Sequence, residues 1–188
     1  MTKSVCVFCG SAAGARPSYS DAARELGGAF ARHGVTLVYG GGRLGLMGIL
    51  ADAALQAGGR VIGVIPRMLI ERELAHPNLT SQHVVASMHE RKTLMAEMSD
   101  GFVGLPGGMG TFDELVEIVT WAQLGLHAKP VVLANIDNYY AALYAMLDNS
   151  VTEGFVTPES RARWRNAESV TAVIRILMKE GLAGGGIS

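Results

Sequence analysis

The stretch Gly101-Phe-Val-Gly-Leu-Pro-Gly-Gly-Met-Gly-Thr-Phe-Asp-Glu114 passes from an apolar run through a glycine-rich turn into a helical pattern. The run Gly101–Leu105 predicts a short buried strand, and the apolar spacing beyond the turn predicts a helix over Thr111–Leu124. A strand that leads through a tight turn into a helix is the repeating unit of a parallel α/β sheet.

The same order recurs along the whole chain. The other predicted strands are Ser4–Phe8, Thr36–Tyr39, Arg60–Ile65, Ser81–Ala86 and Pro130–Ala134. The other predicted helices are Tyr19–His33, Leu44–Ala57, Met88–Ser99, Tyr139–Glu153 and Ser169–Glu180. The strands are mostly apolar throughout, as expected when both faces of a sheet are covered. We predict an α/β fold, a Rossmann-like, doubly wound, mostly parallel sheet with helices on both faces. It would form one domain over residues 1–180, with a flexible tail at 181–188.

Composition limits the classes of partner. The chain has 188 residues, of which 49% are apolar and 18% charged, with a net charge of −1. We therefore expect neither nucleic acid nor membrane as a partner. The N-terminal apolar run is too short for a signal peptide, and no run approaches the length of a membrane span. These features predict a cytoplasmic protein.

Two cysteines form a C-x-x-C motif at Cys6 and Cys9. Because Cys6 lies within a predicted strand, we expect the two thiols to differ in burial. A redox or metal-binding role is disfavoured, since a metal site would need further ligands at matching spacing. The five histidines show no such spacing. We therefore expect no metal and no bound cofactor.

Glycine-rich segments follow three of the predicted strands. They are Cys9-Gly10-Ser11-Ala-Ala-Gly14, Gly40-Gly-Gly-Arg-Leu-Gly-Leu-Met-Gly48 and Pro106-Gly-Gly-Met-Gly-Thr111. In open α/β sheets, ligands bind beyond the carboxyl ends of the strands. We therefore expect these three loops to converge on one edge and form the floor of a binding site.

The second loop matches the dinucleotide fingerprint in its letters, as Gly40-x-Gly42-x-x-Gly45. An NAD site also needs an acidic residue about 20 positions further on. That region reads Ile65-Pro-Arg67, without an acid. A P-loop motif is also missing. Two interpretations remain, a site for the phosphate of a smaller ligand or glycines that only allow close strand–helix packing.

Thr111-x-x-Glu114 has the spacing of a capping box, in which Thr111 caps the helix and Glu114 bonds back to the cap. The Glu114 carboxylate could equally face a bound sugar beside the glycine loops. Spacing alone leaves both interpretations open.

Arg91 lies on an apolar stripe of its predicted helix, together with Met88, Met95 and Met98. A buried arginine is uncommon unless it is paired, and its planar fork suits a carboxylate or phosphate. The alternative is a side chain that reaches solvent. Lys92 lies one step round the helix and is expected at the rim.

These motifs together resemble the LOG family, the cytokinin riboside 5′-monophosphate phosphoribohydrolases that were once labelled lysine decarboxylases. The resemblance rests on the Cys9-Gly-Ser11 opening, the Gly40–Gly48 loop, Pro66-Arg-x₅-Glu73, Met88-His-Glu-Arg-Lys92, Pro106–Glu114 and Thr120-Trp-Ala-Gln-Leu-Gly125. Phe112-Asp113 departs from the Leu-Glu that plant members commonly carry, which leaves the motif intact.

The resemblance implies that Arg91 and Glu114 are the catalytic pair. It also implies substrate contacts from Ser11, Gly41, Gly42, Met47, Glu73, Arg91, Lys92, Gly108, Met109, Gly110, Thr111, Phe112, Asp113, Glu114 and Thr120. It further implies at least a homodimer and leaves open a site completed across the interface.

The function expected from this resemblance is hydrolysis of the N-glycosidic bond of a purine or cytokinin riboside 5′-monophosphate to free base and ribose 5-phosphate. Glu114 would stabilise the cationic sugar or activate water, and Arg91 would hold Glu114 or the phosphate. Arginine is a poor acid, so Glu73, Asp113 and water remain candidates for protonating the base. The rival class is a nucleotide or cofactor carrier of the same fold. A pyridoxal-dependent decarboxylase would need a Schiff-base lysine, for which Lys92 is the only nearby candidate.

Overall fold

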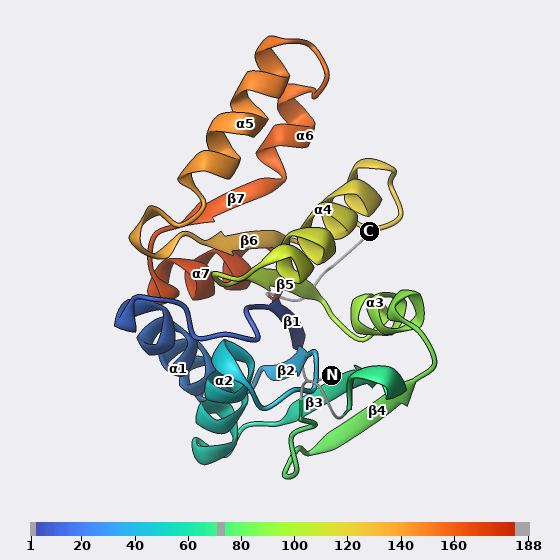
Figure 1. Cartoon of the computed structure of the whole chain (residues 1–188). Coiled ribbons are helices and arrows are strands. Elements are labelled where there is room, and N and C mark those ends of the chain that lie inside the picture. The colour runs from blue at the N-terminus through green and yellow to red at the C-terminus, as the bar shows by residue number, and fades with distance from the viewer. Residues whose placement is uncertain (1–2, 71–73, 183–188) are drawn as a thin grey trace.

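The computed structural model describes residues 3–70 and 74–182. Within them, seven strands form one parallel sheet in the order β4-β3-β2-β1-β5-β6-β7 (Figure 1). The strands are β1 Ser4–Phe8, β2 Thr36–Tyr39, β3 Val61–Pro66, β4 Ser81–Val85, β5 Gly101–Gly104, β6 Val131–Ala134 and β7 Trp164–Ala167. The predicted fold class is confirmed.

Helices cover both faces of this sheet. They are α1 Pro17–Arg32, α2 Gly45–Gln56, α3 Met88–Glu97, α4 Met109–Gln123, α5 Ala141–Thr152, α6 Pro158–Ala162 and α7 Val170–Leu177. Helical single turns lie at η1 Arg67–Leu69, η2 Ile136–Asn138 and η3 Met178–Leu182. Side chains of α1, α2 and α7 share one apolar core, and those of α3, α4 and α5 share the other. Among the described residues, every helix is too short or too polar to cross a bilayer.

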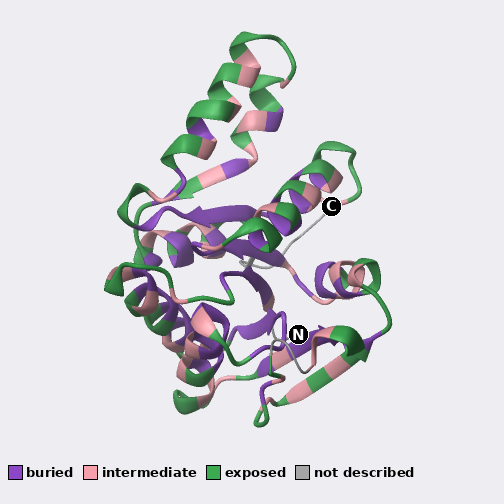
Figure 2. Ribbon diagram, viewed as in Figure 1, coloured by how far each residue is buried: buried purple, intermediate pink, exposed green. Residues whose placement is uncertain are grey.

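Alternate residues of each central strand enter opposite cores. In β1, Val5 and Val7 lie in the core under α1 and α2, while Cys6 and Phe8 lie in the core under α3 and α4. Burial on both faces explains why these strands read as apolar runs rather than as alternating patterns. Figure 2 shows the contrast between the buried centre of the sheet and the exposed outer surface of α5 and α6.

The segment after α5 differs from the prediction. The sequence Trp164-Arg-Asn-Ala167 forms the edge strand β7, which was not predicted, and the short helix α6 precedes it. An edge strand pairs on one side only, and here its middle residues Arg165 and Asn166 remain partly or fully exposed. Its four residues therefore carry too little apolar signal to be recognised.

Of the two interpretations left open for Thr111 and Glu114, the capping box is wrong. Helix α4 begins at Met109, two residues earlier than expected, and its N-cap is Gly108 in an extended conformation without a side-chain cap. Thr111 is therefore the third residue of the helix and Glu114 lies in its second turn. The helix begins immediately after the Pro-Gly-Gly turn. Glu114 therefore lies too far along the helix to take part in capping.

Strand order runs outward in both directions from β1 at the centre of the sheet. β1 pairs with β2 on one side, followed by β3 and β4, and with β5 on the other, followed by β6 and β7. In doubly wound sheets the crevice beyond the strands at such a switch point is the usual ligand site. The loops after β1 and β5, both rich in glycine, border it.

Stability is expected to fall in acid through His127. Its Nε2 lies 2.9 Å from the Ile118 carbonyl, and its Nδ1 accepts from the Lys129 N–H at 3.2 Å. Partial burial lowers the pKa of His127 below its ordinary value of 6.5, outweighing the Ile118 hydrogen bond. Below about pH 6.5 the unfolded chain therefore binds the proton more readily, and the free energy of unfolding should decrease as pH falls. Denaturant titrations from pH 7 to 5 would measure this. His127→Gln should flatten the slope, and an unchanged slope would contradict the assignment.

Candidate active site

The three glycine loops meet at Gly10. The Gly10 N–H donates to the Pro106 carbonyl at 3.1 Å, and the Gly10 carbonyl accepts from the Leu46 N–H at 3.0 Å. A Cβ at this position would lie 2.8 Å from the Ala12 carbonyl oxygen, so only glycine fits. The predicted convergence of the loops after β1, β2 and β5 is confirmed.

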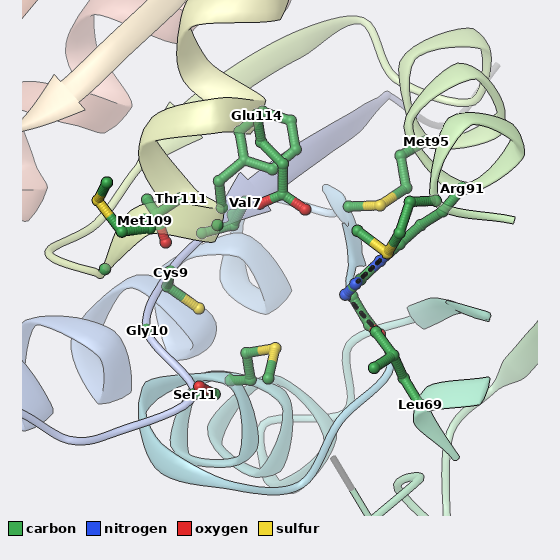
Figure 3. Close-up of a pocket in the computed structure, with 16 residues that line it drawn as sticks. Val7, Cys9, Gly10, Ser11, Leu69, Arg91, Met95, Met109, Thr111 and Glu114 are labelled. Atoms are coloured by element: carbon green, nitrogen blue, oxygen red, sulfur yellow. Dashed lines mark hydrogen bonds between the residues drawn. The ribbon is translucent and has the colours of Figure 1, made fainter. Parts of the chain in front are cut away.

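A pocket of about 220 Å³ opens where these loops meet (Figure 3). It lies beyond the carboxyl ends of β1 and β5, between the N-terminal turns of α3 and α4. Eight of the predicted site residues line it: Ser11, Met47, Arg91, Gly108, Met109, Gly110, Thr111 and Glu114. The fold therefore brings residues that are up to about a hundred positions apart in sequence to the wall of one pocket.

The N-terminus of α4 forms the polar side of the pocket. The first four N–H groups of a helix, here those of Gly108 to Thr111, have no partner within the helix itself. Within residues 3–70 and 74–182 no side-chain cap is recorded for this helix, and a Cβ at Gly108 or Gly110 would meet nothing within 4 Å. These amides and the positive end of the helix dipole thus border open space, an arrangement that suits an anion.

Glu114 lies one helical turn below these amides. Its side chain is only 8% exposed and points into the pocket from α4 (Figure 3). At 1.5 Å of rise per residue, Glu114 is about 4.5 Å along the axis from Thr111. A bound group could therefore contact the amides with one end and the carboxylate with the other.

Arg91 reaches the same pocket from α3. It is 4% exposed, and its Nη2 donates to the Gly40 carbonyl at 3.0 Å. A Cβ on Gly40 would lie 1.9 Å from that Nη2, so glycine at this position makes room for the guanidinium. The interpretation of Arg91 as a solvent-reaching surface residue is wrong. Burial between Met88, which is half-buried, and Met95 fixes its direction.

The two cysteines lie beneath this charged pair. Both are reduced and buried, Cys6 at 0% and Cys9 at 8% exposure, so the expected difference in burial is wrong. The chain turns inward after β1, which buries Cys9 under the loops, where it lines the pocket. Burial and then the Glu114 carboxylate raise the pKa of the Cys6 thiol well above its usual value, against the opposing charge of Arg91. Cys6 is therefore a neutral core residue.

The second loop is used mainly for packing. A Cβ on Gly45 would lie 2.4 Å from the Ser11 carbonyl carbon, and one on Gly48 would lie 2.0 Å from the Arg43 carbonyl oxygen. The α2 N-terminus is closed by the loop after β1, because the Leu46 N–H already bonds to Gly10. Of the two interpretations of this loop, close packing applies to Gly45 and Gly48, and Gly40 is its one glycine on the pocket wall, beside Met47.

Several predicted contact residues lie off the pocket wall. Gly41, with φ +78°, accepts from the His76 N–H, and Gly42 bridges to Ala75, so both shape the loop. Phe112 stacks on Tyr139. Thr120 is exposed further along α4 and donates to the Val116 carbonyl. Glu73 and residues 183–188 of the expected tail lie outside the described residues.

Lys92 and Asp113 pair with each other at the rim. Lys92 Nζ lies 3.1 Å from carboxylate oxygens of both Asp113 and Glu117. Partial burial favours the neutral amine, but the bonds to Glu117 and Asp113 outweigh it and raise the pKa of Lys92. This amine is therefore a charged structural partner rather than a nucleophile. No lysine lines the described wall of the pocket.

Half of the lining residues were not in the predicted set. They are Val7, Phe8, Cys9, Gly10, Gly40, Leu69, Met88 and Met95. The helical stripe shared with Arg91 could have added Met88 and Met95, and the loop pattern could have added Gly10 and Gly40. Val7, Phe8 and Leu69 carry no signal in the sequence, because only the packing of the sheet brings them here. Within residues 3–70 and 74–182, no three His, Cys, Asp or Glu side chains gather to hold a metal ion.

Comparison with known proteins places the chain in a family. The family model described as "Possible lysine decarboxylase" matches residues 47–177. The cytokinin riboside 5′-monophosphate phosphoribohydrolase LOG1 of Arabidopsis thaliana is 47% identical over 93% of this chain and 82% of its own length. The corresponding protein of Rhodococcoides fascians is 49% identical over 92% of this chain and 89% of its own. The chain belongs to the LOG family. The resemblance drawn from the sequence motifs is confirmed.

Solved structures share the fold of this LOG-family chain at lower identity. A molybdenum cofactor binding protein from Rippkaea orientalis superimposes with a TM-score of 0.72 at 22% identity, covering 95% of this chain and 97% of that one. A Moco carrier protein from Chlamydomonas reinhardtii gives 0.73 at 24% identity, covering 97% and 99%. At such identities the likeness establishes the Rossmann-like architecture alone.

Proposed function

We propose that this LOG-family chain hydrolyses the N-glycosidic bond of a purine or cytokinin riboside 5′-monophosphate. The observation that carries the proposal is the shared pocket of the Glu114 carboxylate, the uncapped amides of α4 and the Arg91 guanidinium. The names of its close relatives support the same reaction. The substrate class is a small nucleotide rather than a nucleic acid.

The phosphate would lie on the amides of Gly108 to Thr111, which gives the substrate a fixed end. The ribose would then lie along the first turns of α4, with its C1′ near Glu114. The apolar side chains of Met47, Met95 and Leu69 form the part of the wall left for the base. An uncharged ring suits this environment because it loses little hydration there.

Breaking the C1′–N bond leaves positive charge on the sugar, as in glycoside hydrolysis. The Glu114 carboxylate would stabilise that charge and orient a water, whose oxygen bonds to C1′ while its proton passes to the departing base. The products are the free base and ribose 5-phosphate. Arg91 would hold a substrate oxygen and fix its direction, since it keeps its own proton. Asp113 is an unsuitable acid for the base because it faces Lys92 at the rim.

We also propose a homodimer in the cytoplasm. Apolar residues are exposed in the turns that follow α4 and α5, with Leu124 at 68%, Leu126 at 70% and Phe155 at 87% exposure. Exposed large apolar side chains of this kind favour an association surface. Thr120 lies on the same helix outside the pocket, which is consistent with a substrate contact made to the partner subunit's site. Two cysteines that are not joined in a disulfide suit a reducing compartment.

Incubation with adenosine monophosphate and with its N6-isopentenyl derivative tests the reaction. We expect stoichiometric free base and ribose 5-phosphate by chromatography, with no phosphate release. A decarboxylase is not supported by the pocket, since Lys92 is paired outside it. Tight binding of nucleotide without base release, after prolonged incubation, would instead favour a carrier, the role named for the structural neighbour from Chlamydomonas reinhardtii.

A further inference from the structure

Two consecutive tyrosines from the β6–α5 connection hold the loop that precedes α4. The Tyr139 hydroxyl donates to the Gly107 carbonyl, and the Tyr140 hydroxyl donates to the Leu105 carbonyl at 2.6 Å. Neither tyrosine belongs to the motifs that identify the family. Both bonds join segments more than 30 residues apart in sequence.

The two hydrogen bonds differ in whether the peptide unit that accepts them also carries an N–H. In a trans peptide the C=O and the following N–H point in opposite directions. The Leu105 carbonyl belongs to a peptide with Pro106, which has no N–H to direct. The Gly107 carbonyl belongs to the peptide whose N–H is that of Gly108, the N-cap of α4. Only Tyr139 therefore controls the direction of a hydrogen-bond donor.

This peptide lies between two cavities. Gly107, Gly108 and Tyr139 line a second cavity of about 240 Å³, and Gly108 also lines the first pocket. Within the described chain, no acceptor is assigned to the Gly108 N–H. A flexible glycine peptide without side-chain contacts would rotate readily, so a fixed direction requires a partner on its carbonyl.

Several contacts fix the position of Tyr139. Its ring stacks on Phe112 and makes edge contacts with Tyr19 and Tyr140 at 5.7 and 5.0 Å. Asp137 and Asn138 before it adopt left-handed backbone conformations with φ of 50° and 58°. Aspartate and asparagine adopt this conformation more readily than other side-chain-bearing residues, and two in succession give the connection a tight turn.

A side-chain contact holds this turn against α1. The Asp137 carboxylate accepts from the Ser18 hydroxyl at 2.5 Å. The connection between β6 and α5 is thus tied to a helix on the other face of the sheet. These contacts hold the Tyr139 hydroxyl in position beside the Gly107 carbonyl.

We propose that Tyr139 is a positioning residue that fixes the Gly107–Gly108 peptide so that the Gly108 N–H points at the 5′-phosphate of the substrate. The proposal rests on the hydrolase function above and deepens it, because it assigns phosphate recognition to an amide aimed by a side chain. A hydrogen bond on the carbonyl also polarises the peptide and strengthens its N–H as a donor. Discrimination between nucleotides and nucleosides would then depend on Tyr139.

The test is Tyr139→Phe, which keeps the three ring contacts and removes only the hydroxyl. Calorimetry with ribose 5-phosphate should give an affinity about three- to tenfold lower than that of the wild type. KM for adenosine monophosphate should rise by the same factor with kcat nearly unchanged, because the phosphate contact is made equally in the ground state and the transition state. Turnover of adenosine, which has no phosphate, should stay at the wild-type value.

Tyr140→Phe is the matched control. It removes an equivalent hydroxyl from the same loop, at a peptide without an N–H, so we expect a lower Tm and an unchanged preference for nucleotide over nucleoside. Equal losses with adenosine and adenosine monophosphate in Tyr139→Phe, or an unchanged affinity for ribose 5-phosphate, would overturn the proposal. If the wild type releases no base, the proposed hydrolase function is wrong. The affinities of the wild type and of Tyr139→Phe for ribose 5-phosphate would still test the role of Tyr139.

Discussion

Glu114→Gln is expected to lower kcat by about 10²- to 10⁴-fold while the protein melts near the wild-type temperature. The substitution keeps the volume and shape of a side chain that is only 8% exposed. It removes the negative charge that would face the cationic sugar and the base that would orient water. Helix α4 should be unaffected, because its N-cap is Gly108 and Glu114 plays no part in capping. Release of free base from adenosine monophosphate, together with thermal melting, measures both quantities.

Glu117→Gln provides the matched control on the same helix. It makes the same chemical change one turn further on, where the carboxylate pairs with Lys92 outside the pocket. We expect small effects on kcat and on Tm, since such partly exposed ion pairs contribute little. Comparable rates for Glu114→Gln and the control would mean that the carboxylate in the pocket has no chemical role.

Arg91→Ala is expected to reduce kcat/KM by about 100-fold or more, because it removes the one described cationic side chain that lines the pocket. Arg91→Lys should recover little of this loss, since an ammonium group lacks the planar fork and cannot repeat its geometry. The same pocket can be perturbed without touching the arginine. In Gly40→Ala the new methyl group would lie 1.9 Å from Nη2, so the guanidinium must move and activity should fall with it.

Gly28→Ala controls for the change from glycine to alanine. Gly28 lies in α1, and a Cβ there would meet only the flexible end of Arg32, at 3.2 Å. We expect unchanged activity and a slight gain in stability, because alanine favours the helix. If Gly40→Ala and Arg91→Lys both turn over nucleotide at the wild-type rate, the position of the guanidinium does not matter and Arg91 is a structural residue.

Much of the fold could be predicted from local patterns. The strands Ser4–Phe8 and Thr36–Tyr39 are found at their expected bounds, because a central parallel strand is apolar on both faces and each of these two leads into a glycine-rich loop. The edge strand β7 could not be predicted, since half of it faces solvent and pairing with β6 alone defines it. The start of α4 could not be predicted correctly either. Thr111 and Glu114 have the spacing of a capping box, but the helix begins at Met109 with Gly108 as its N-cap.

The candidate site divides in a similar way. The motif around Glu114 and the stripe around Arg91 could be recognised from residue types and spacing, as could the three glycine loops. Burial of both cysteines could not, since it depends on the path of the chain beyond β1. The role of Tyr139 had no sequence signal either, because its partner Gly107 lies 32 residues away.

The sequence by itself determined the family, the parallel α/β architecture and the two charged residues around which the chemistry is proposed. It could do so because periodicity, turns and motifs are local properties, each contained within one turn or one helix. Only the tertiary structure decided which of those residues share a pocket, which glycines make room for others, and which amides remain open. These properties depend on contacts such as that between Gly40 and Arg91, 51 residues apart, which exist only once the sheet has brought its loops to one edge.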